Sequence, residues 1–297
     1  MSERRFARVA VLAGGVSSER EVSLRSGAAV AEGLRAGGYA VSEVDVTARE
    51  IVLPEDAEAV FVALHGSFGE DGGAQEALER LGVPYTGSGP ASCRLSFDKA
   101  ASRERLEAAG VPVPEGEMLR RAEERTLSLP VVAKPPKEGS SVGCRLVFEE
   151  AEWPAAFAEA ARFSGEALVE RYVPGRELTV GVLEGEALPA VEIVTASTWY
   201  DYEAKYVTGD TRYVVPAELP VSVENRLSEL ALATFDALDA RTFGRVDFRL
   251  SGEGEPFVLE LNAIPGFTTS SLLPKAAEAA GIGFSELCVR IMRRARI

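Results

Sequence analysis

The sequence has few of the residues on which metal and redox sites are commonly built. Its 297 residues include one histidine, His65, and three cysteines, Cys93, Cys144 and Cys288. The cysteines are far apart, odd in number and without the paired spacing of zinc ligands. This usage argues against a zinc site and fits a reducing compartment, where disulfides are rare. We therefore expect a cytoplasmic protein.

Long apolar runs and an excess of positive charge are also missing. No run approaches the roughly 20 apolar residues that cross a bilayer, and residues 1–5 lead into a short strand-like stretch at 7–12 rather than into a secretory signal. The formal net charge of −14 disfavours nucleic acid and anionic membranes as partners. ATP is not excluded, because local Lys, Arg and Mg²⁺ set the potential in a site.

What is present is a globular composition, with 46% hydrophobic residues, and an ordered series of strand and helix patterns. In the first third, strands alternate with helices, and Ser18 with Glu21 has the spacing of a capping box. This alternation predicts a mostly parallel sheet. The strands are expected at 7–12, 40–46 and 59–64, and the helices at about 18–36 and 73–81. The rest of the chain has mainly antiparallel strand patterns with fewer helices, which indicates an α+β arrangement.

Two loops leave the predicted parallel strands at their carboxyl ends, where ligands bind in such sheets. They are residues 14–19 and 65–71. His65 begins the second loop, and from its position it is either a structural histidine or part of a site. No Gly-x-Ser-x-Gly elbow is present, so the sequence gives little support to a hydrolase triad.

A predicted hairpin near the C-terminal end gathers polar side chains. Residues two apart share a face of a strand, so Arg245 and Asp247 lie opposite Val246 and Phe248. On the second strand Glu260 and Asn262 lie on one face, and Phe257, Leu259 and Leu261 on the other. Carboxylate and amide oxygens of this kind suit Mg²⁺ with phosphate oxygens. The alternative is an ordinary hairpin with a solvated polar face.

Three further segments have candidate roles. Lys134 ends an apolar strand and precedes the small-residue turn 139–143, which is either an anion cradle or a plain β-turn. The crossover 170–177 offers backbone groups and Glu177 to a nucleoside, or is a solvated surface crossover. The aromatic segment 196–213 lacks periodicity and is long for a loop, which favours a lid over a reactive intermediate.

Taken in order, these segments resemble the D-alanine–D-alanine ligase family of the ATP-grasp superfamily. The matching stretches extend from Val9 to about Val289 and are 14–23, 63–66, 84–88, 98–99, 139–143, 200–206, 244–247 and 260–268. The resemblance implies an N-terminal Rossmann-like substrate domain (1–95), a central ATP-grasp lobe (96–175) and a C-terminal lobe with the metal site and lid (176–297). It implies ligation of two D-alanines through a D-alanyl phosphate, for peptidoglycan precursor synthesis, by a homodimer.

The resemblance also implies the residues that bind ATP and metal. Those that contact ATP are Lys99, Lys134, Ser140 and Ser141 at the phosphates, Glu170 and Val173 at adenine, Glu177 at ribose, and Lys205 and Leu259. Asp247, Glu260 and Asn262 would hold two Mg²⁺ ions, or Mn²⁺ in their place.

For the amino acids, the resemblance places Glu19 at the ammonium of the first D-alanine, with His65 nearby. Ser271 and Leu272 would receive the carboxylate of the second D-alanine. Arg245 and the Gly266 N–H would form the oxyanion site. Ser140 and Tyr206 would hydrogen-bond to Glu19 and connect the lid to the substrate.

The resemblance says less about the acceptor, which is the second substrate. Relatives that make D-alanyl-D-lactate commonly have Phe where this chain has Tyr206, so the tyrosine favours an amine acceptor. D-serine and D-lactate remain alternative acceptors. Departures are few: Ala263 stands where Thr is frequent, and Ser270 is at a variable position. A nucleotide-binding regulator without turnover is a rival hypothesis, although Arg245 has no evident purpose in a sensor. A generic Rossmann-like binding module would leave the hairpin unexplained.

Overall fold

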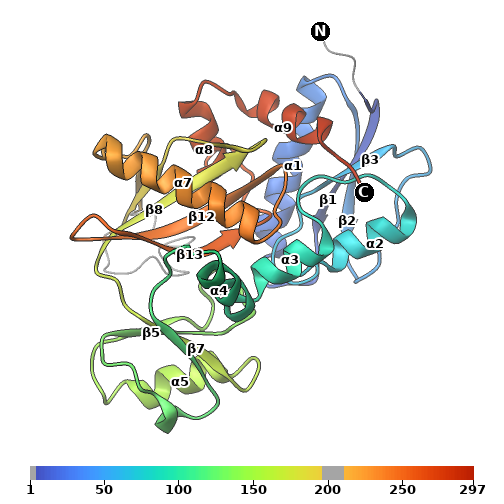
Figure 1. Cartoon of the computed structure of the whole chain (residues 1–297). Coiled ribbons are helices and arrows are strands. Elements are labelled where there is room, and N and C mark those ends of the chain that lie inside the picture. Colours follow the sequence, from blue (N-terminus) through green and yellow to red (C-terminus); the bar gives the residue numbers. More distant parts are fainter. Residues whose placement is uncertain (1–4, 196–210) are drawn as a thin grey trace.

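The computed structural model describes residues 5–195 and 211–297. Three sheets organise these residues, one three-stranded and parallel, the other two antiparallel (Figure 1). The sheets follow one another along the chain in the order predicted from the strand patterns. Most of the predicted lid segment, including Lys205 and Tyr206, lies outside the described residues.

The N-terminal sheet has the strand order β2-β1-β3 and is parallel. Its central strand is buried from its second residue onward, as is typical of parallel strands covered on both faces. Helix α1 packs closely on this strand, since a Cβ on Gly27 would lie 2.3 Å from Ala13 Cβ. The elements are β1 (Arg8–Gly14), α1 (Arg20–Ala36), β2 (Ala40–Val46), β3 (Ala59–Val62) and α2 (Gly73–Leu81).

The predicted capping box at the start of α1 is wrong. The helix begins at Arg20, and Glu19 in the N-cap position makes no side-chain cap. Ser17 instead organises the entry to the helix, since its Oγ accepts from the Glu19 N–H at 3.2 Å and donates to the His65 carbonyl at 2.7 Å. A tertiary bond to the neighbouring loop therefore replaces the local cap, and the Glu19 side chain takes no part in capping the helix.

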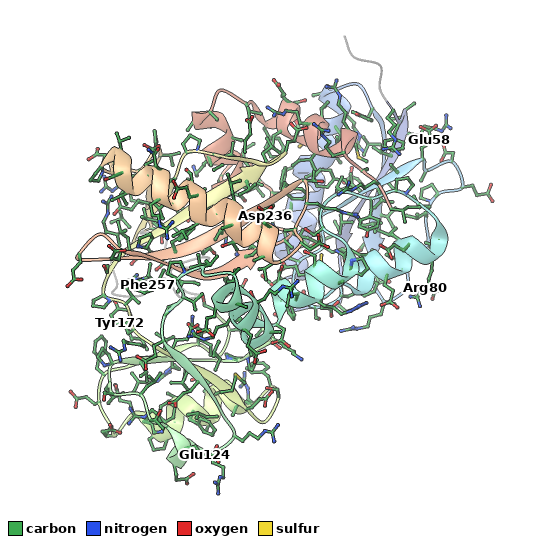
Figure 2. The ribbon with its side chains drawn as sticks, viewed as in Figure 1. Glu58, Arg80, Glu124, Tyr172, Asp236 and Phe257 are labelled. Carbon is green, nitrogen blue, oxygen red and sulfur yellow. The ribbon has the colours of Figure 1, made fainter. Side chains whose placement is uncertain are left out.

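Two helices, α3 and α4, lead into the central lobe. They meet at Asp98, whose carboxylate accepts from the Ala101 N–H at 3.2 Å. The lobe itself is a four-stranded antiparallel sheet of order β4-β7-β5-β6. The elements are α3 (Pro90–Phe97), α4 (Lys99–Ala108), β4 (Gly116–Leu119), η1 (Ala122–Glu124), β5 (Val131–Lys134), β6 (Arg145–Val147), α5 (Trp153–Ala161) and β7 (Ala167–Arg171). Figure 2 shows Glu124 at the far tip of this lobe and Tyr172 near its junction with the third sheet.

The third sheet is antiparallel and carries the predicted hairpin, β12 with β13, beside β8. Its elements are β8 (Gly175–Leu183), β9 (Glu186–Ala187), β10 (Val191–Val194), β11 (Arg212–Val214), β12 (Phe243–Ser251) and β13 (Pro256–Asn262). Helix α7 (Val221–Ala237) covers one face of the sheet (Figure 1). Val246, Phe248 and Leu250 are buried in the cluster that includes α7, so the intervening Arg245, Asp247 and Arg249 occupy the opposite face.

The last two helices complete the first domain's core. They are α8 (Leu272–Ala279) and α9 (Phe284–Arg293). Cys288, Ile291 and Met292 of α9 are buried in the same cluster as Val30 and Leu34 of α1. In the described part of the chain, no helix has the length and apolar character needed to cross a membrane.

The predicted face of Leu259 is wrong, because a β-bulge interrupts the alternation of β13. Asp247 pairs with Glu260, but the next residue, Phe248, pairs with Val258. Leu259 is the extra residue, and an extra residue shifts the side-chain alternation by one. Val258 and Leu261 therefore enter the α7 core, while Leu259 is only half-buried and lies outside that cluster. The predicted face of Phe257 is wrong for the same reason, because Phe257 pairs with Arg249 on the face opposite the core.

Candidate active site

A cavity of about 430 Å³ is lined by residues from all three parts of the chain. Many of the residues that the sequence singled out line it: Glu19, His65, Lys99, Ser140, Arg245, Glu260, Asn262, Gly266, Ser271 and Leu272. Other candidates lie outside its lining: Lys134, Ser141, Glu170, Val173, Glu177, Asp247 and Leu259. Lys205 and Tyr206 are not among the described residues.

Asp247 is the centre of the polar face of the hairpin. Arg245 donates to both its carboxylate oxygens, from Nε at 2.8 Å and from Nη2 at 2.7 Å. Thr179 Oγ1 donates to Oδ1 at 2.6 Å, and Asn262 Nδ2 donates to Oδ2 at 3.0 Å. The structure thus brings Asp247, Glu260 and Asn262 together, as the strand alternation predicted. Pairing across the hairpin places Arg245 beside Asn262 and Asp247 beside Glu260.

Lys99 joins this hairpin to the central lobe. Its ammonium donates to the Glu138 carbonyl at 2.6 Å and lies 3.3 Å from Glu260 Oε2. The lysine is the first residue of α4, so the Asp98 cap fixes where its side chain starts. It is mostly buried and therefore presents a fixed positive charge at the cavity wall.

Lys134, the last residue of β5, forms a buried ion pair with Glu170 of the neighbouring strand β7. Arg103 Nη1 lies 3.4 Å from the second Glu170 oxygen. Burial lowers the pKa of Lys134, but the Glu170 carboxylate more than offsets this and leaves that pKa above its ordinary value. Lys134 therefore stays an ammonium with its charge held next to the site.

The crossover between β7 and β8 is organised by one buried arginine. Arg249 Nε donates to the Val173 carbonyl at 3.0 Å, and Nη2 donates to the Gly175 carbonyl at 3.0 Å. Its guanidinium also lies 3.2 Å from Glu177 Oε2 and 5.3 Å from the centre of the Tyr172 ring. These contacts fix the crossover's backbone and give Glu177 a defined position.

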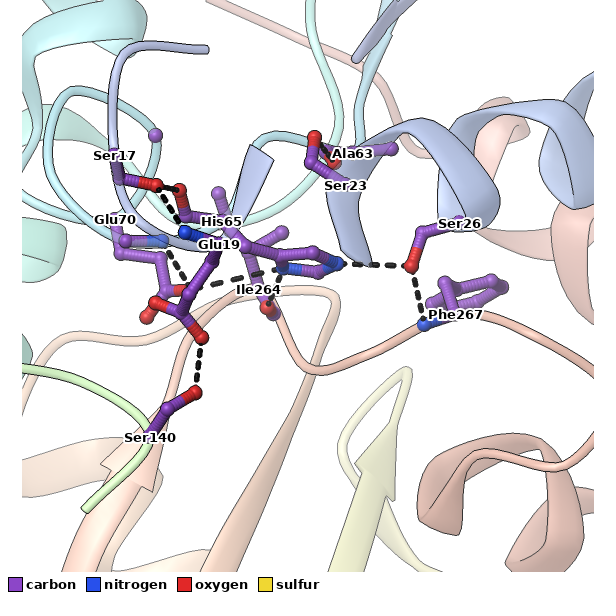
Figure 3. A network of polar contacts seen from close by, with 12 residues as sticks. Ser17, Glu19, Ser23, Ser26, Ala63, His65, Glu70, Ser140, Ile264 and Phe267 are labelled. Carbon is purple, nitrogen blue, oxygen red and sulfur yellow. Dashed lines mark hydrogen bonds and ion pairs between the residues drawn. The ribbon is translucent and has the colours of Figure 1, made fainter. Parts of the chain in front are cut away.

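The small-residue turn of the central lobe reaches the N-terminal domain. Ser140 Oγ donates to Glu19 Oε1 (Figure 3). Ser140 and Ser141 both have positive φ, at 49° and 58°, a conformation that non-glycine residues rarely adopt. They are the two central residues of a β-turn, in which the Val142 N–H donates to the Gly139 carbonyl at 3.0 Å, so the structure has a tight turn beside the cavity.

His65 is buried in a network of polar contacts (Figure 3). Its Nε2 lies 2.9 Å from Ser26 Oγ, and its Nδ1 lies 3.1 Å from the Ile264 carbonyl and 3.6 Å from Glu70 Oε1. The Glu70 oxygen also accepts from the Gly66 N–H at 2.9 Å. His65 thus links α1 to the loop that follows β13.

That loop and the start of α8 close the cavity. Ser271 is in the N-cap position of α8, and its Oγ accepts from the Thr268 N–H at 3.0 Å. Leu272 is the first residue of the helix. The Gly266 N–H has no hydrogen-bond partner within residues 5–195 and 211–297, so this donor is available to a ligand.

The sequence reading missed several lining residues, of which Ser26, Glu70 and Glu138 have the clearest polar roles. Ser26 lies seven residues after Glu19, a spacing that puts both on one face of a helix. Glu70 belongs to a loop already expected at the ligand edge. Burial raises the pKa of Glu138. The helix spacing could have found Ser26, whereas no local signal marks Glu138.

The oxygens of the hairpin fit a divalent cation of the magnesium type. Asp247 and Glu260 supply carboxylates, and Arg245 and Lys99 already approach them as cations. No cluster of three or more His, Cys, Asp or Glu residues suited to a metal occurs among the described residues. An ion here would therefore also need the Asn262 amide and substrate oxygens, which is the usual situation for Mg²⁺.

Known proteins are similar to this chain over most of its length. The family model described as "D-ala D-ala ligase C-terminus" matches residues 106–293. The chain is 46% identical over 298 residues to the D-alanine–D-alanine ligase of Anaeromyxobacter sp. (strain Fw109-5), covering 96% of each chain. It is 43% identical over 302 residues to that of Citrifermentans bemidjiense, covering 100% of this chain and 99% of the relative.

Solved structures of two ligases are also similar to this chain. The D-alanine–D-alanine ligase from Bacillus anthracis complexed with ATP matches with a TM-score of 0.85 and 34% identity, over 96% of this chain and 95% of that one. The VanG D-Ala:D-Ser ligase from Enterococcus faecalis matches with a TM-score of 0.85 and 28% identity, over 96% of this chain and 98% of that one.

Proposed function

The chain belongs to the D-alanine–D-alanine ligase family of ATP-grasp enzymes, and from this we infer that it joins two D-alanines at the expense of ATP, for peptidoglycan synthesis. The observation that carries the inference is the convergence of Glu19, Lys99 and Arg245 on one cavity, each from a different part of the chain. A carboxylate for an ammonium and two cations for phosphate and carboxylate groups are the set that this reaction requires.

The chemistry we propose has two steps. A carboxylate oxygen of the first D-alanine attacks the γ-phosphorus of ATP, and ADP leaves, which gives D-alanyl phosphate. The amine of the second D-alanine then attacks the acyl carbon, and phosphate leaves as the amine loses a proton. The first step is needed because a free carboxylate is a poor electrophile.

For ATP, we propose that Lys99, Lys134, Ser140 and Ser141 contact the phosphates. The short distances from Lys99 to the Glu138 carbonyl and to Glu260 support this role, since the ammonium is already at the cavity wall. The nucleoside residues that we propose are Glu170 and Val173 for adenine, Glu177 for ribose, and Leu259 and Lys205. The buried Arg249, which contacts Val173 and Glu177, supports this assignment.

We propose that Asp247, Glu260 and Asn262 hold Mg²⁺, in two ions, with Mn²⁺ as a substitute. When bound, Mg²⁺ supplies positive charge next to the transferring phosphoryl group. The side chains of the chain itself orient these ligands, since Thr179, Arg245 and Asn262 all contact Asp247.

For the amino acids, we propose Glu19 at the first ammonium with His65 nearby, and Ser271 and Leu272 at the second carboxylate. Arg245 and the Gly266 N–H would meet the oxyanion of the second step. The Gly266 N–H makes no hydrogen bond within the described residues, which supports this role, because a donor left for the developing charge lowers the barrier more than one already in use. Tyr206 would complete the link from Ser140 to Glu19.

The decisive experiment is ADP release measured with D-alanine, L-alanine or no amino acid. We expect release only with the D form. ATP binding in calorimetry without D-alanine-dependent ADP release would instead support the alternative of a nucleotide-binding regulator without turnover.

The acceptor needs its own test, because a D-Ala:D-Ser ligase shares this fold. We propose D-alanine as acceptor. A panel in which D-serine or D-lactate replaces part of the D-alanine identifies the product by mass. We also propose a homodimer, which sedimentation velocity would test.

A further inference from the structure

The loop between β13 and α8, residues 263–271, carries the Gly266 N–H, and two residues of the N-terminal domain hold it. His65 Nδ1 lies 3.1 Å from the Ile264 carbonyl, and the Phe267 N–H donates to Ser26 Oγ at 3.1 Å. Figure 3 shows both contacts, at Ile264 and at Phe267, and Gly266 lies between these two residues in the sequence. Pro265, between Ile264 and Gly266, has no N–H to offer.

The direction of each hydrogen bond follows from the donors and acceptors available. A carbonyl can only accept, so His65 donates from Nδ1 to Ile264. In neutral histidine Nε2 is then an acceptor, and the Ser26 hydroxyl, which accepts from Phe267, donates its own proton to Nε2. Every donor in this chain of contacts has an acceptor, so the arrangement specifies one position of the loop.

Aromatic packing also holds the loop in place. The Phe267 ring is buried, with its centre 5.5 Å from that of Phe61 and 5.8 Å from that of Phe243 in edge-on geometry. Phe267 is therefore fixed by both its ring and its N–H, directly after Gly266.

We propose that Ser26 and His65 are positioning residues that hold the Gly266 N–H toward the cavity, where it meets the oxyanion. This rests on the proposed function of the same site. Ser26 touches no reacting atom in this scheme and acts only through the loop. A displacement of the order of 1 Å at such a site can cost about 10²-fold in rate.

The test compares Ser26→Ala with Ser23→Ala. Both serines are fully buried on α1, three residues apart. Ser23 Oγ donates to the Ala63 carbonyl at 2.7 Å and has no hydrogen bond to the loop among the described residues. Each substitution removes one buried hydroxyl, so the loss of stability should be similar, and only Ser26→Ala should release residues 263–268.

We expect Ser26→Ala to lower kcat about 10- to 100-fold, with the KM for ATP within about twofold of wild type. Ser23→Ala should keep kcat within about threefold. Hydrogen–deuterium exchange of the peptide that spans 263–268 should become faster in Ser26→Ala and stay unchanged in Ser23→Ala, whether or not substrate is present.

Equal losses of kcat in the two variants, or unchanged exchange of 263–268 in Ser26→Ala, would overturn the positioning role. Failure of the proposed function gives a different result, since wild-type protein would then release no ADP in response to D-alanine. The exchange measurement does not depend on that activity, so it tests the clamp on the loop separately.

Discussion

Arg245 is the side chain on which the proposed second step depends most directly. Its guanidinium is held by both oxygens of Asp247 and lines the cavity. Removing one oxyanion donor typically costs about 2.7–4 kcal/mol of barrier. We expect Arg245→Ala to lower kcat by about 10²-fold or more, with little change in ATP affinity.

Stopped-time product assays and calorimetric ATP titration would measure the two quantities. Arg226→Ala is the matched control, because Arg226 is exposed on α7 and contacts only Glu229 at 3.3 Å among the described residues. Near-normal turnover in Arg245→Ala would contradict the assignment.

The Lys134–Glu170 pair makes a prediction about stability. Lys134 is 7% exposed and Glu170 4% exposed. Removing one member of a buried pair leaves an uncompensated charge and costs about 3–5 kcal/mol, although Arg103 remains near Glu170. We expect Lys134→Met to lower the free energy of unfolding strongly, and Lys134→Met with Glu170→Gln to recover part of the loss. Denaturant titration measures both, and strictly additive losses would argue against a coupled pair.

At the residue scale, the sequence predicted those side-chain positions that depend on the alternation of faces along a strand. Asp247, Glu260 and Asn262 were placed together by counting residues in a hairpin, and the structure brings them together. Leu259 was placed on the wrong face, because a bulge adds a residue without a clear sequence signal. Ser26 was missed because its partner, the Phe267 N–H, is 241 residues away in the chain.

At the scale of elements, α9 is tied to the β8–β9 turn by one carboxylate. Glu184 lies 2.6 Å from Arg294 Nε and 2.7 Å from Arg290 Nε. Burial raises the pKa of Glu184, but the hydrogen bonds from Arg294 and Arg290 outweigh this and leave that pKa below its ordinary value of 4.5. The contribution to stability is therefore full above about pH 4.5 and is lost as the pH falls through the lower, folded-state pKa.

We expect Glu184→Gln to lower the free energy of unfolding by about 1.5–3 kcal/mol at pH 7. The difference from wild type should shrink as the pH falls below about 4. Denaturant titrations at both pH values test this. A difference that grows in acid would contradict the sign of the shift.

Most elements were predicted by periodicity, and the misses have local causes. The strands of the first sheet and the hairpin were found because their apolar residues follow a period of two or form a continuous run. Helix α3 was missed, although Gly89 followed by Pro90 is a typical helix start. The start of α1 was misplaced because a tertiary bond from Ser17 to the His65 carbonyl replaces the cap.

At the scale of the whole molecule, the central lobe and the N-terminal domain meet at Gly139 and Glu19. A Cβ on Gly139 would lie 2.9 Å from Glu19 Oε2, closer than such atoms normally approach. We expect Gly139→Ala to displace the Glu19 carboxylate, which is the end of a flexible side chain, and thereby to raise the KM for D-alanine. Gly252→Ala is the control, since nothing lies within 4 Å of a Cβ there. Steady-state kinetics of both variants measure the KM for D-alanine. Equal values in the two variants would contradict a steric conflict between residue 139 and Glu19.

How the three sheets meet was not predictable from spacing alone. Composition and periodicity indicated a parallel sheet followed by antiparallel ones, but the cavity between them depends on contacts such as Ser140 with Glu19 and Lys99 with Glu260. That arrangement came only from the family resemblance. The domain boundaries at 95 and 175 stay a prediction. Helix α9, which follows both boundaries in the sequence, packs on α1, which precedes them.

The pairing of Arg296 with Tyr85, together with α9 on α1, has a consequence for biosynthesis. The ribosome makes the first sheet early, yet part of the apolar surface of α1 packs on α9, whose residues are translated much later. Until α9 is made, the surface of α1 at Gly33 and Gly37, which meets Cys288 and Val289, stays uncovered. We therefore expect the first sheet and α1 to reach their final packing only after residues 284–293 have been made.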